Sequence, residues 1–382
     1  MAMFNLKSTN KLARRGELTT NHGVVQTPVF MPIATAGAVK TLMASEVTAL
    51  GASVILGNTY HLLLRPGEER MRALGGLHTL MRHDGPILTD SGGYQVFSLA
   101  NLNSTDEDGV TFQSHIDGAR IRLTPASSMA MQDAIDADIM MQFDDVAAGV
   151  STRERYDDAM RRSLRWAKES KAAANPSRQL FGIVQGGTHE DLRKVSAEGL
   201  IEIGFDGYAI GGLSVGESRV DTFRITKMLG AMLPVDKPRY FMGGGMPEEI
   251  VYYVSVGVDM FDCVLPTRNA RHGMLFVWKG DPAECVREAF ARAQDGAADF
   301  RIADALYDKV QITRGVFADD TTPIDAHNDG APTSQQYSRA YLHMLFKIEE
   351  MLAFRLATIQ NLRFYLRMME ELRKCIKVAS NE

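Results

Sequence analysis

The feature that most constrains this chain is a series of eight short apolar runs, most of which end at Gly, Asp or Gln. The runs are 28–33, 53–57, 86–90, 139–144, 180–185, 207–212, 239–244 and 260–264. Each is too short for a typical helix and rich in Val, Ile, Phe or Met, as strands buried on both faces are. Helical periodicity lies between them, at 44–50, 65–74, 156–174, 191–203 and 247–256. Strands that alternate with helices in this way predict an α/β fold, a (β/α)8 TIM barrel.

The main alternative to a barrel is a doubly wound open sheet. That fold would carry Gly-x-Gly-x-x-Gly after an early strand, and no early run here is followed by it. The chain length of 382 residues also suits one barrel with additions, because such barrels take about 250 residues.

Composition excludes several classes of protein. The hydrophobic share of 45% and charged share of 23%, with a net charge of −5, are ordinary globular values that exclude disorder. No apolar run approaches the roughly 20 residues of a bilayer span, and the first residues do not resemble a signal peptide. Three scattered cysteines predict no disulfide framework. We therefore expect a cytoplasmic protein without membrane association.

Three additions interrupt the alternation. Residues 1–27 predict antiparallel strands that turn near His22, and the gap after the third run predicts an inserted antiparallel pair around Asp117-Gly118. After the last run come helix-like stretches at 282–294 and 300–309 and then a turn-rich segment. The expected division is 1–27 (N-terminal strands), 28–272 (barrel), 273–335 (inserted subdomain) and 336–382 (C-terminal helices packed on the barrel).

Acidic and amide side chains stand where the strands of a barrel enzyme present their chemistry, at the carboxyl ends. The set comprises Asp90, Asp144, Asp145, Gln185 and Asp262, with glycine pairs after the sixth and seventh runs. An N-cap role explains one such Asp, whereas acids on three different strands favour a site. Glycine amides and carboxylates together suit the edges of a guanine-like ring, although these residues alone do not single out guanine. Two carboxylates also suit glycosidic-bond chemistry.

Local positive charge adds a hint of nucleic acid. Arg268 and Arg271 follow Asp262 closely, where they could meet phosphates beside a reacting sugar. The basic stretch 161–171 is explained about as well by a solvated helix face.

Five long motifs lie in order along the chain: Gly57-Asn-Thr-Tyr-His-Leu, Leu88-Thr-Asp90-Ser-Gly-Gly-Tyr94-Gln, Phe181-Gly-Ile-Val-Gln185-Gly, Gly207-Tyr-Ala-Ile-Gly-Gly212-Leu-Ser-Val-Gly-Glu217 and Met260-Phe-Asp262-Cys-Val-Leu-Pro-Thr-Arg268. Together they resemble the tRNA-guanine transglycosylase (queuine tRNA-ribosyltransferase) family, and the match resumes at 337–343. The resemblance implies a (β/α)8 enzyme that exchanges guanine at wobble position 34 of GUN-anticodon tRNAs for a 7-deazaguanine, either queuine or its aminomethyl precursor.

The resemblance also implies residue roles. Asp262 matches the nucleophile, and Asp90 matches the general acid/base that also touches the purine. The positions that match the base pocket are Asp90, Ser91, Tyr94, Asp144, Gln185, Gly212, Leu213 and Met242. Arg268 and Arg271 are the expected tRNA contacts. Exchange with retained configuration needs two inversions, which implies a covalent aspartyl-ribosyl intermediate.

The sequence departs from the family at its zinc site. The positions that match the family's ligands are Asp329, Ala331, Ser334 and Gln360. Because these cannot form a tetrahedral Cys/His set, we expect no metal and no other cofactor. Either the subdomain has decayed, or the additional segment 281–308 holds it by apolar packing instead. The candidates for that packing are Val286, Phe290, Phe300, Leu306 and Tyr307.

Partners and alternatives complete the expectations. The resemblance implies tRNA and a 7-deazaguanine base as partners. It also implies a homodimer, because Tyr337 and Tyr341 match the family's interface aromatics. Two other functions stay open: a non-catalytic paralogue that acts as a tRNA-binding or partner subunit, and a base-exchanging enzyme on another nucleic acid. The residue types at two pocket positions, Val146 and Val215, favour different 7-deazaguanines, so they do not decide which base is used.

Overall fold

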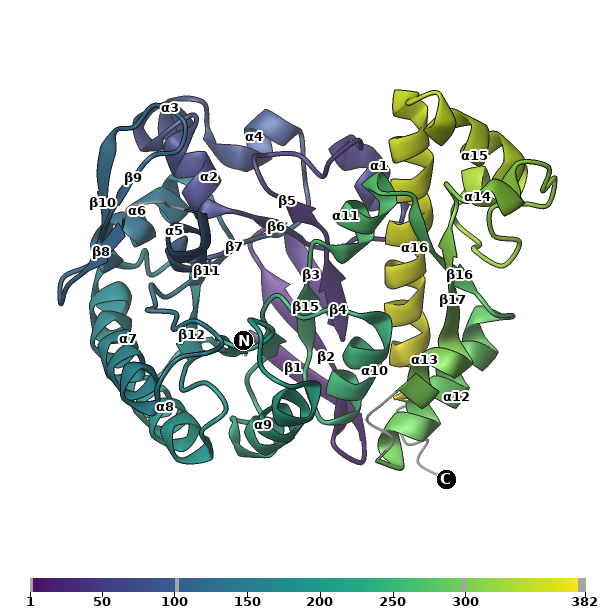
Figure 1. Ribbon diagram of the computed structural model, residues 1–382. Coiled ribbons are helices and arrows are strands. Elements are labelled where there is room, and N and C mark those ends of the chain that lie inside the picture. The colour runs from purple at the N-terminus through teal and green to yellow at the C-terminus, as the bar shows by residue number, and fades with distance from the viewer. Residues whose placement is uncertain (1–2, 100–102, 297–299, 377–382) are drawn as a thin grey trace.

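The computed structural model describes residues 3–99, 103–296 and 300–376 and contains a closed parallel barrel (Figure 1). The strands follow each other in the order β4 (Val29–Met31), β15 (Met260–Asp262), β14 (Arg239–Phe241), β13 (Gly207–Ile210), β12 (Gln179–Val184), β11 (Ile139–Met141), β7 (Ile87–Thr89), β6 (Ile55–Gly57) and β5 (Ile33–Ala34). β4 and β5 are halves of one strand interrupted at Pro32, which has no N–H for the ladder. The expected eight-stranded barrel is therefore confirmed.

Helices follow the barrel strands and cover them. They are α1 (Ala44–Ala49), α2 (Thr59–Leu64), α3 (Glu68–Ala73), α4 (Gly76–Met81), α5 (Gly93–Leu99), α6 (Pro125–Ile135), α7 (Arg153–Ala173), α8 (Glu190–Ile203), α9 (Arg219–Met232), α10 (Pro247–Ser255) and α11 (Leu265–Arg271). Thr152 and Ser218 cap α7 and α9 through their side-chain oxygens, as N-cap residues do. No helix in the described ranges is long and apolar enough to cross a membrane.

The N-terminal strands form an antiparallel sheet of β1 (Phe4–Asn10), β2 (Ala13–Thr20) and β3 (Gly23–Thr27). The turn between β2 and β3 is joined to the barrel by His22, whose backbone N–H and Nδ1 lie 3.1 and 2.9 Å from Asp138 Oδ1. Asp138 directly precedes β11, so this sheet lies at the amino ends of the barrel strands. The opposite end of the barrel, where the strands have their carboxyl ends, is therefore left for the candidate site.

The insertion between β7 and β11 contains the expected antiparallel pair. β9 (Val110–Gln113) pairs with β10 (Arg120–Leu123) across the Asp117-Gly118 turn, and β8 (Asn103–Thr105) adds a third strand. The buried side of this sheet packs on Tyr60 of α2 and Trp166 of α7.

The segment after the barrel contains a two-stranded sheet and several helices. β16 (Met274–Trp278) pairs antiparallel with β17 (Tyr307–Gln311), and the helices are α12 (Pro282–Gln294), α13 (Phe300–Leu306), α14 (Pro332–Gln336), α15 (Arg339–Lys347) and α16 (Met351–Cys375), with a 3-10 turn at Gly315–Phe317. The expected helical stretch 300–309 is wrong at its end. Tyr307 pairs with Trp278 across the sheet, and this tertiary pairing overrides a short helical periodicity.

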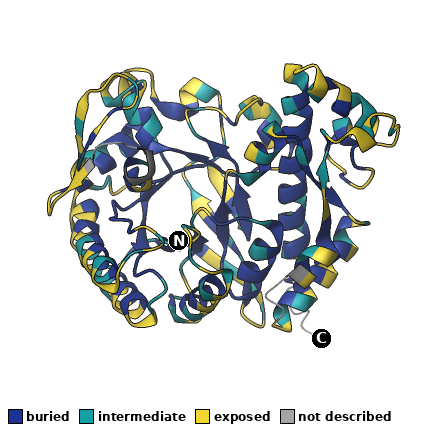
Figure 2. Ribbon diagram, viewed as in Figure 1, coloured by how far each residue is buried: buried dark blue, intermediate teal, exposed yellow. Residues whose placement is uncertain are grey.

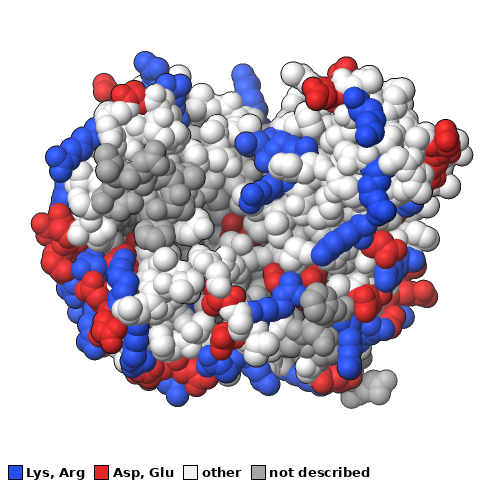
Figure 3. All heavy atoms as spheres, in the orientation of Figure 1, with Lys and Arg blue, Asp and Glu red and all other residues white. Residues whose placement is uncertain are grey.

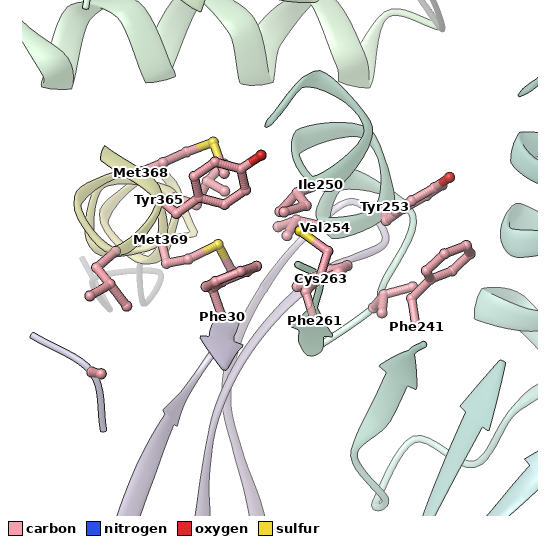
Figure 4. Close-up of a cluster of buried hydrophobic side chains, with 14 of the residues drawn as sticks. Phe30, Phe241, Ile250, Tyr253, Val254, Phe261, Cys263, Tyr365, Met368 and Met369 are labelled. Carbon is pink, nitrogen blue, oxygen red and sulfur yellow. The ribbon is translucent and has the colours of Figure 1, made fainter. Parts of the chain in front are cut away.

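Helix α16 lies between the barrel and the β16–β17 sheet, and most of its length is buried (Figures 1 and 2). Tyr365 and Met369 face Phe30 of β4, and the Phe30 and Tyr365 ring centroids are 4.9 Å apart (Figure 4). Helix α16 therefore packs on the barrel through β4 and α10. Packing of this kind, rather than propensity, supplies most helix stability.

Segment 281–308 contributes to the same core. Val286, Phe290, Leu306 and Tyr307 are all buried, and the Tyr307 hydroxyl donates to Glu248 Oε2 at 2.8 Å. The Phe300 side chain lies outside the described residues.

Two of the four positions that match zinc ligands, Gln360 and Asp329, bond to other groups of the protein, while Ser334 Oγ is buried without a partner among the described residues. Gln360 is fully buried and donates through Nε2 to Phe276 O at 2.7 Å and to Asp325 Oδ2 at 2.9 Å. Its Oε1 accepts from Asn328 Nδ2 at 2.9 Å. Asp329 forms ion pairs with Arg363 and Arg367, and Ala331 offers no ligand atom. This set does not fit the nitrogen and sulfur ligands of a structural zinc ion.

Candidate active site

Three buried carboxylates stand at the carboxyl ends of different barrel strands. Asp262 ends β15, Asp90 directly follows β7, and Asp144 lies three residues after β11. The charge on Asp90 contributes to a raised pKa at both Asp144 and Asp262, so the three groups share one electrostatic environment. The space-filling view shows a hollow on this face with acidic atoms at its floor (Figure 3).

Asp262 is held by one of its two oxygens. Oδ1 accepts from the Tyr240 hydroxyl at 2.5 Å and from the Gly243 amide at 2.9 Å. No donor among the described residues bonds to Oδ2, which leaves this oxygen available to an electrophile. Burial raises the pKa of Asp262 from 3.8 to about 6, and the charge on Asp90 adds to the rise. A carboxylate that is fixed and only weakly solvated suits a nucleophile.

Asp90 is held by both of its oxygens. Oδ1 accepts from the Thr59 amide at 2.7 Å, while Oδ2 accepts from Asn58 Nδ2 at 2.5 Å and from Gln95 Nε2 at 2.6 Å. Burial nevertheless leaves the pKa of Asp90 raised. A carboxyl group whose proton affinity is raised in this way is suited to exchange a proton with a ligand.

Asp144 connects two other residues of the expected pocket. Its Oδ1 accepts from Ser91 Oγ and its Oδ2 from Gln185 Nε2, both at 2.7 Å. Burial raises the pKa of Asp144 to about 6. Ser91, Asp144 and Gln185 thus form one polar wall across the ends of β7, β11 and β12.

The glycine pairs were expected because their amides suit the edge of a ring. The structure gives a different reason for glycine at most of these positions. A Cβ at Gly212 would lie 2.2 Å from Gln185 Oε1, and one at Gly244 would lie 2.1 Å from the Phe241 ring. The space is therefore filled by neighbouring side chains of the protein. Gly243 is the exception: its Cβ position is open, and its positive φ of 72° turns its amide toward Asp262.

Asp145 lies outside this group, although it adjoins Asp144 in sequence. It forms ion pairs with Arg155 and Arg162 of α7 at 2.6 Å. Arg162 and Arg165 also pair with Glu107, and Arg161 pairs with Asp157. These pairs explain the basic stretch 161–171 as a charge-balanced helix face.

The remaining expected residues lie around the carboxylates. Tyr94, at the start of α5, is 47% exposed, whereas Leu213 is buried in the loop after β13. The Met242 sulfur would lie 3.5 Å from a Cβ on Gly211, which places Met242 across the end of β13. Arg268 is exposed and Arg271 half-buried on α11, where Figure 3 shows basic side chains beside the hollow.

Sequence reasoning missed several residues that hold the carboxylates. Tyr240 fixes Asp262, and Asn58, Thr59 and Gln95 fix Asp90. Asn58, Thr59 and Gln95 lie inside motifs that the sequence already singles out. For Tyr240, the available signal was a hydroxyl-bearing side chain within an otherwise apolar run.

One group in the described residues brings possible metal ligands within 4.8 Å of one another: His22, His78 and Asp136. It lies at the other end of the barrel. The His22 and His78 rings stack with centroids 3.7 Å apart, so one ion cannot lie in both ring planes as they stand. Asp136 pairs with Arg178, and Asp138 accepts from His22. Hydrogen bonding accounts for this group.

Comparisons with known proteins agree with the motifs. The family described as "Queuine tRNA-ribosyltransferase" matches residues 8–380. A protein named queuine tRNA-ribosyltransferase from Mannheimia succiniciproducens is 48% identical over 381 residues, covering 98% of this chain and 93% of the relative. Its namesake from Syntrophobacter fumaroxidans is 49% identical over 366 residues, covering 96% and 90%.

Proposed function

Since the chain belongs to the queuine tRNA-ribosyltransferase family, we propose that it exchanges guanine at wobble position 34 of GUN-anticodon tRNAs for a 7-deazaguanine base. The chain is a tRNA-guanine ribosyltransferase, a pentosyl-transferring enzyme. The observation that carries the finer proposal is the free Oδ2 of Asp262 beside the buried Asp90 and Asp144. Because its substrate is tRNA, we also propose that the enzyme is cytoplasmic.

The proposed reaction is a double displacement. Asp262 Oδ2 attacks the ribose C1′, the C1′–N9 bond breaks, and guanine leaves after it receives a proton from Asp90. The incoming base loses its proton to Asp90 and attacks the same carbon, which releases Asp262 as a carboxylate. Two inversions at C1′ give net retention of its configuration. Asp90 acts as the acid in one half-reaction and as the base in the other.

The wall formed by Ser91, Asp144 and Gln185 supports a guanine ligand. A carboxylate accepts from N1–H and the 2-amino group, whereas Gln185 and the Gly212 amide can donate to the ring carbonyl. Tyr94 and Met242 are the proposed faces of the ring sandwich, and the Leu213 carbonyl is proposed to meet the substituent of a 7-deazaguanine. Arg268 and Arg271 are proposed to bind tRNA phosphates.

Incorporation of radiolabelled guanine into unmodified GUN-anticodon tRNA tests the function. We expect incorporation, followed by displacement of the label when queuine or its aminomethyl precursor is added in turn. A tRNA with another anticodon is the control and should remain unlabelled. Binding of tRNA without incorporation would instead support the non-catalytic alternative, and incorporation into other nucleic acids alone would support the third function.

Asp144→Asn is expected to weaken guanine binding by about 10- to 100-fold, because hydrogen bonds to a charged group contribute about 1.5–3 kcal/mol. The fold should persist, since an amide can still donate to Ser91 Oγ and accept from Gln185 Nε2. Calorimetric titration with guanine measures the effect. Asp145→Asn is the matched control, because Asp145 is paired with α7 and acts on Asp144 only through its charge, so base affinity should change far less than in Asp144→Asn. Equal affinities in the two variants would remove Asp144 from the pocket.

We also propose that the protein folds and acts without zinc. The support is the buried hydrogen-bond network that Asp325 and Asn328 form with Gln360, one of the positions that match the family's zinc ligands. Incubation with a strong zinc chelator is therefore expected to leave both Tm and guanine exchange unchanged, unlike proteins whose folding depends on the metal. Elemental analysis of dialysed protein is the second measurement. One equivalent of retained zinc, or a fall in Tm with chelator, would contradict the proposal.

A homodimer is the proposed assembly. The corner between α15 and α16 exposes large apolar side chains, with Met351 80% and Ile348 62% accessible. The Tyr337 and Tyr341 rings stack at the start of α15, with 5.3 Å between their centroids. Apolar patches of this kind mark interaction surfaces. Light scattering should give twice the chain mass of 42.2 kDa, and Met351→Asp should shift the protein toward the monomer.

A further inference from the structure

A buried arginine lies directly behind the proposed base pocket. Arg193 of α8 is 0% exposed, and its guanidinium donates to four backbone carbonyls. Nε donates to Gly187 O at 2.7 Å, Nη1 to Val184 O and Gly211 O at 2.7 Å each, and Nη2 to Gly212 O at 3.3 Å. These carbonyls belong to the last residue of β12, Val184, and to the loops that follow β12 and its neighbour β13.

The charge of Arg193 has no carboxylate within ion-pair distance among the described residues. Burial lowers its pKa to about 9, with only the longer-range charge of Glu217 and the neighbouring Tyr156 acting in the opposite direction. Burying an unpaired charge costs several kcal/mol, and an apolar side chain of similar volume would avoid that cost. A role in holding the two loops in one geometry accounts for the arginine.

The carbonyls that Arg193 holds determine where the adjoining amides point. In a trans peptide the C=O and the N–H lie on opposite sides, and the Gly211–Gly212 bond is trans. Because the Gly211 carbonyl faces Arg193, the Gly212 N–H faces away from it. No acceptor among the described residues bonds to that N–H. The amide is therefore available to a ligand.

Helix α8 also fixes Gln185 through the same peptide geometry. The Val184 carbonyl accepts from Arg193, while the Gln185 amide donates to Ser196 Oγ at 3.0 Å. Arg193 and Ser196 are one helical turn apart, so one face of α8 holds both ends of a single peptide unit. The Gln185 side chain then reaches Asp144.

We propose that Arg193 is a positioning residue for the base: it locks the ends of β12 and β13 so that Gln185 and the Gly212 amide meet guanine together. This inference rests on the proposed function, because guanine is the ligand that these groups would bind. Arg193 does not touch the base. Its effect should therefore fall on base affinity rather than on the bond-breaking step.

The test compares Arg193→Met and Arg193→Lys with wild type in guanine exchange and in calorimetric guanine binding. We expect the KM and Kd for guanine to rise about 100-fold in Arg193→Met, with kcat at saturating guanine within about threefold of wild type. Arg193→Lys should recover part of the affinity, since an ammonium can still donate to some of the carbonyls, though not in the planar fork of arginine. Ser196→Ala, which removes only the Gln185 amide contact, should raise KM by about 3- to 10-fold.

Arg239→Lys is the matched control. Arg239 is also buried and donates to Leu233 O and Gly257 O, but it lies at the amino end of β14, away from the pocket. The Arg239→Lys substitution should lower Tm without changing the KM for guanine. If the Arg193 variants behave like this control, the positioning role is wrong. If Arg193→Met fails to fold, the KM values of Arg193→Lys and Ser196→Ala for guanine decide whether Arg193 has a positioning role. Wild-type protein that binds guanine without exchanging it would overturn the proposed function instead.

Discussion

Asp262→Asn is expected to abolish guanine exchange while making the protein more stable at neutral pH. An amide is too poor a nucleophile to form the glycosyl ester, so no covalent tRNA adduct should survive denaturing electrophoresis. Stability should rise because Tyr240 and Gly243 both donate to Oδ1, and an Asn oxygen can accept from both. The amide nitrogen then takes the place of Oδ2, where no donor among the described residues opposes it.

The sign of the stability effect follows from the pKa. Folding raises the pKa of Asp262 from 3.8 to about 6, so the protonated acid favours the folded state and this contribution is lost as pH rises from about 4 to 6. Above pH 6 the buried carboxylate costs the fold up to about 3 kcal/mol, since one pKa unit is about 1.4 kcal/mol. The Tm advantage of Asp262→Asn should therefore be largest above pH 6 and shrink toward pH 4. Wild-type exchange should fall as pH drops through about 6, because the nucleophile becomes protonated.

Thermal melts of both proteins from pH 4 to 8, with adduct trapping at pH 7.5, measure these effects. The conservative Asp145→Asn substitution is the control and should retain the adduct. An adduct in Asp262→Asn would show that the nucleophile is another residue. A Tm below that of wild type at pH 7.5 would show that Oδ2 has a structural role that the hydrogen bonds do not reveal.

The barrel could be predicted from the sequence because parallel strands buried on both faces read as uninterrupted apolar runs. The ends of those runs also located Asp90, Asp144 and Asp262, since the carboxyl ends of barrel strands meet on one face. The stretch 307–309 could not be assigned in the same way. Its strand state depends on pairing with residues 29 or more positions earlier in the chain, which local periodicity does not report.

The partners of the site residues could not be predicted. Tyr240 and Asp262 lie on neighbouring strands, and their contact depends on the stagger of β14 against β15. Arg193 shows the same limit, because its position within a helical stretch gives no sign that it reaches two strand ends. The glycine pairs were located, yet only the structure shows that Phe241 and Gln185 fill the space beside them. Sequence indicates which groups are present, whereas their hydrogen bonds depend on the three-dimensional packing.

Asp90→Asn is expected to slow guanine exchange by about 100- to 10,000-fold, the usual contribution of general acid–base catalysis. In contrast to Asp262→Asn, it should also destabilise the fold. Both oxygens of Asp90 accept hydrogen bonds, from Thr59 on one side and from Asn58 and Gln95 on the other. Whichever oxygen becomes the amide nitrogen of Asn would therefore face an N–H group that needs an acceptor. A buried donor left unpaired in this way lowers the free energy of unfolding by about 1–3 kcal/mol.

The comparison of these two variants tests the assignment of roles more sharply than either loss of activity alone. Asp262 remains in Asp90→Asn, so a slow covalent adduct with tRNA should still accumulate, and its release by added guanine should be slow because no base removes the proton of the incoming ring. Single-turnover trapping, followed by a chase with guanine, measures both steps. Asp90→Glu keeps the acid but displaces it, and we expect it to recover part of the rate. If Asp90→Asn melts like wild type and releases the adduct at the wild-type rate, Asp90 is neither the proton carrier nor the centre of this hydrogen-bond cluster. The reaction would then need another acid, and the proposal would turn to Asp144, the other carboxylate of the proposed pocket, whose pKa burial raises to about 6.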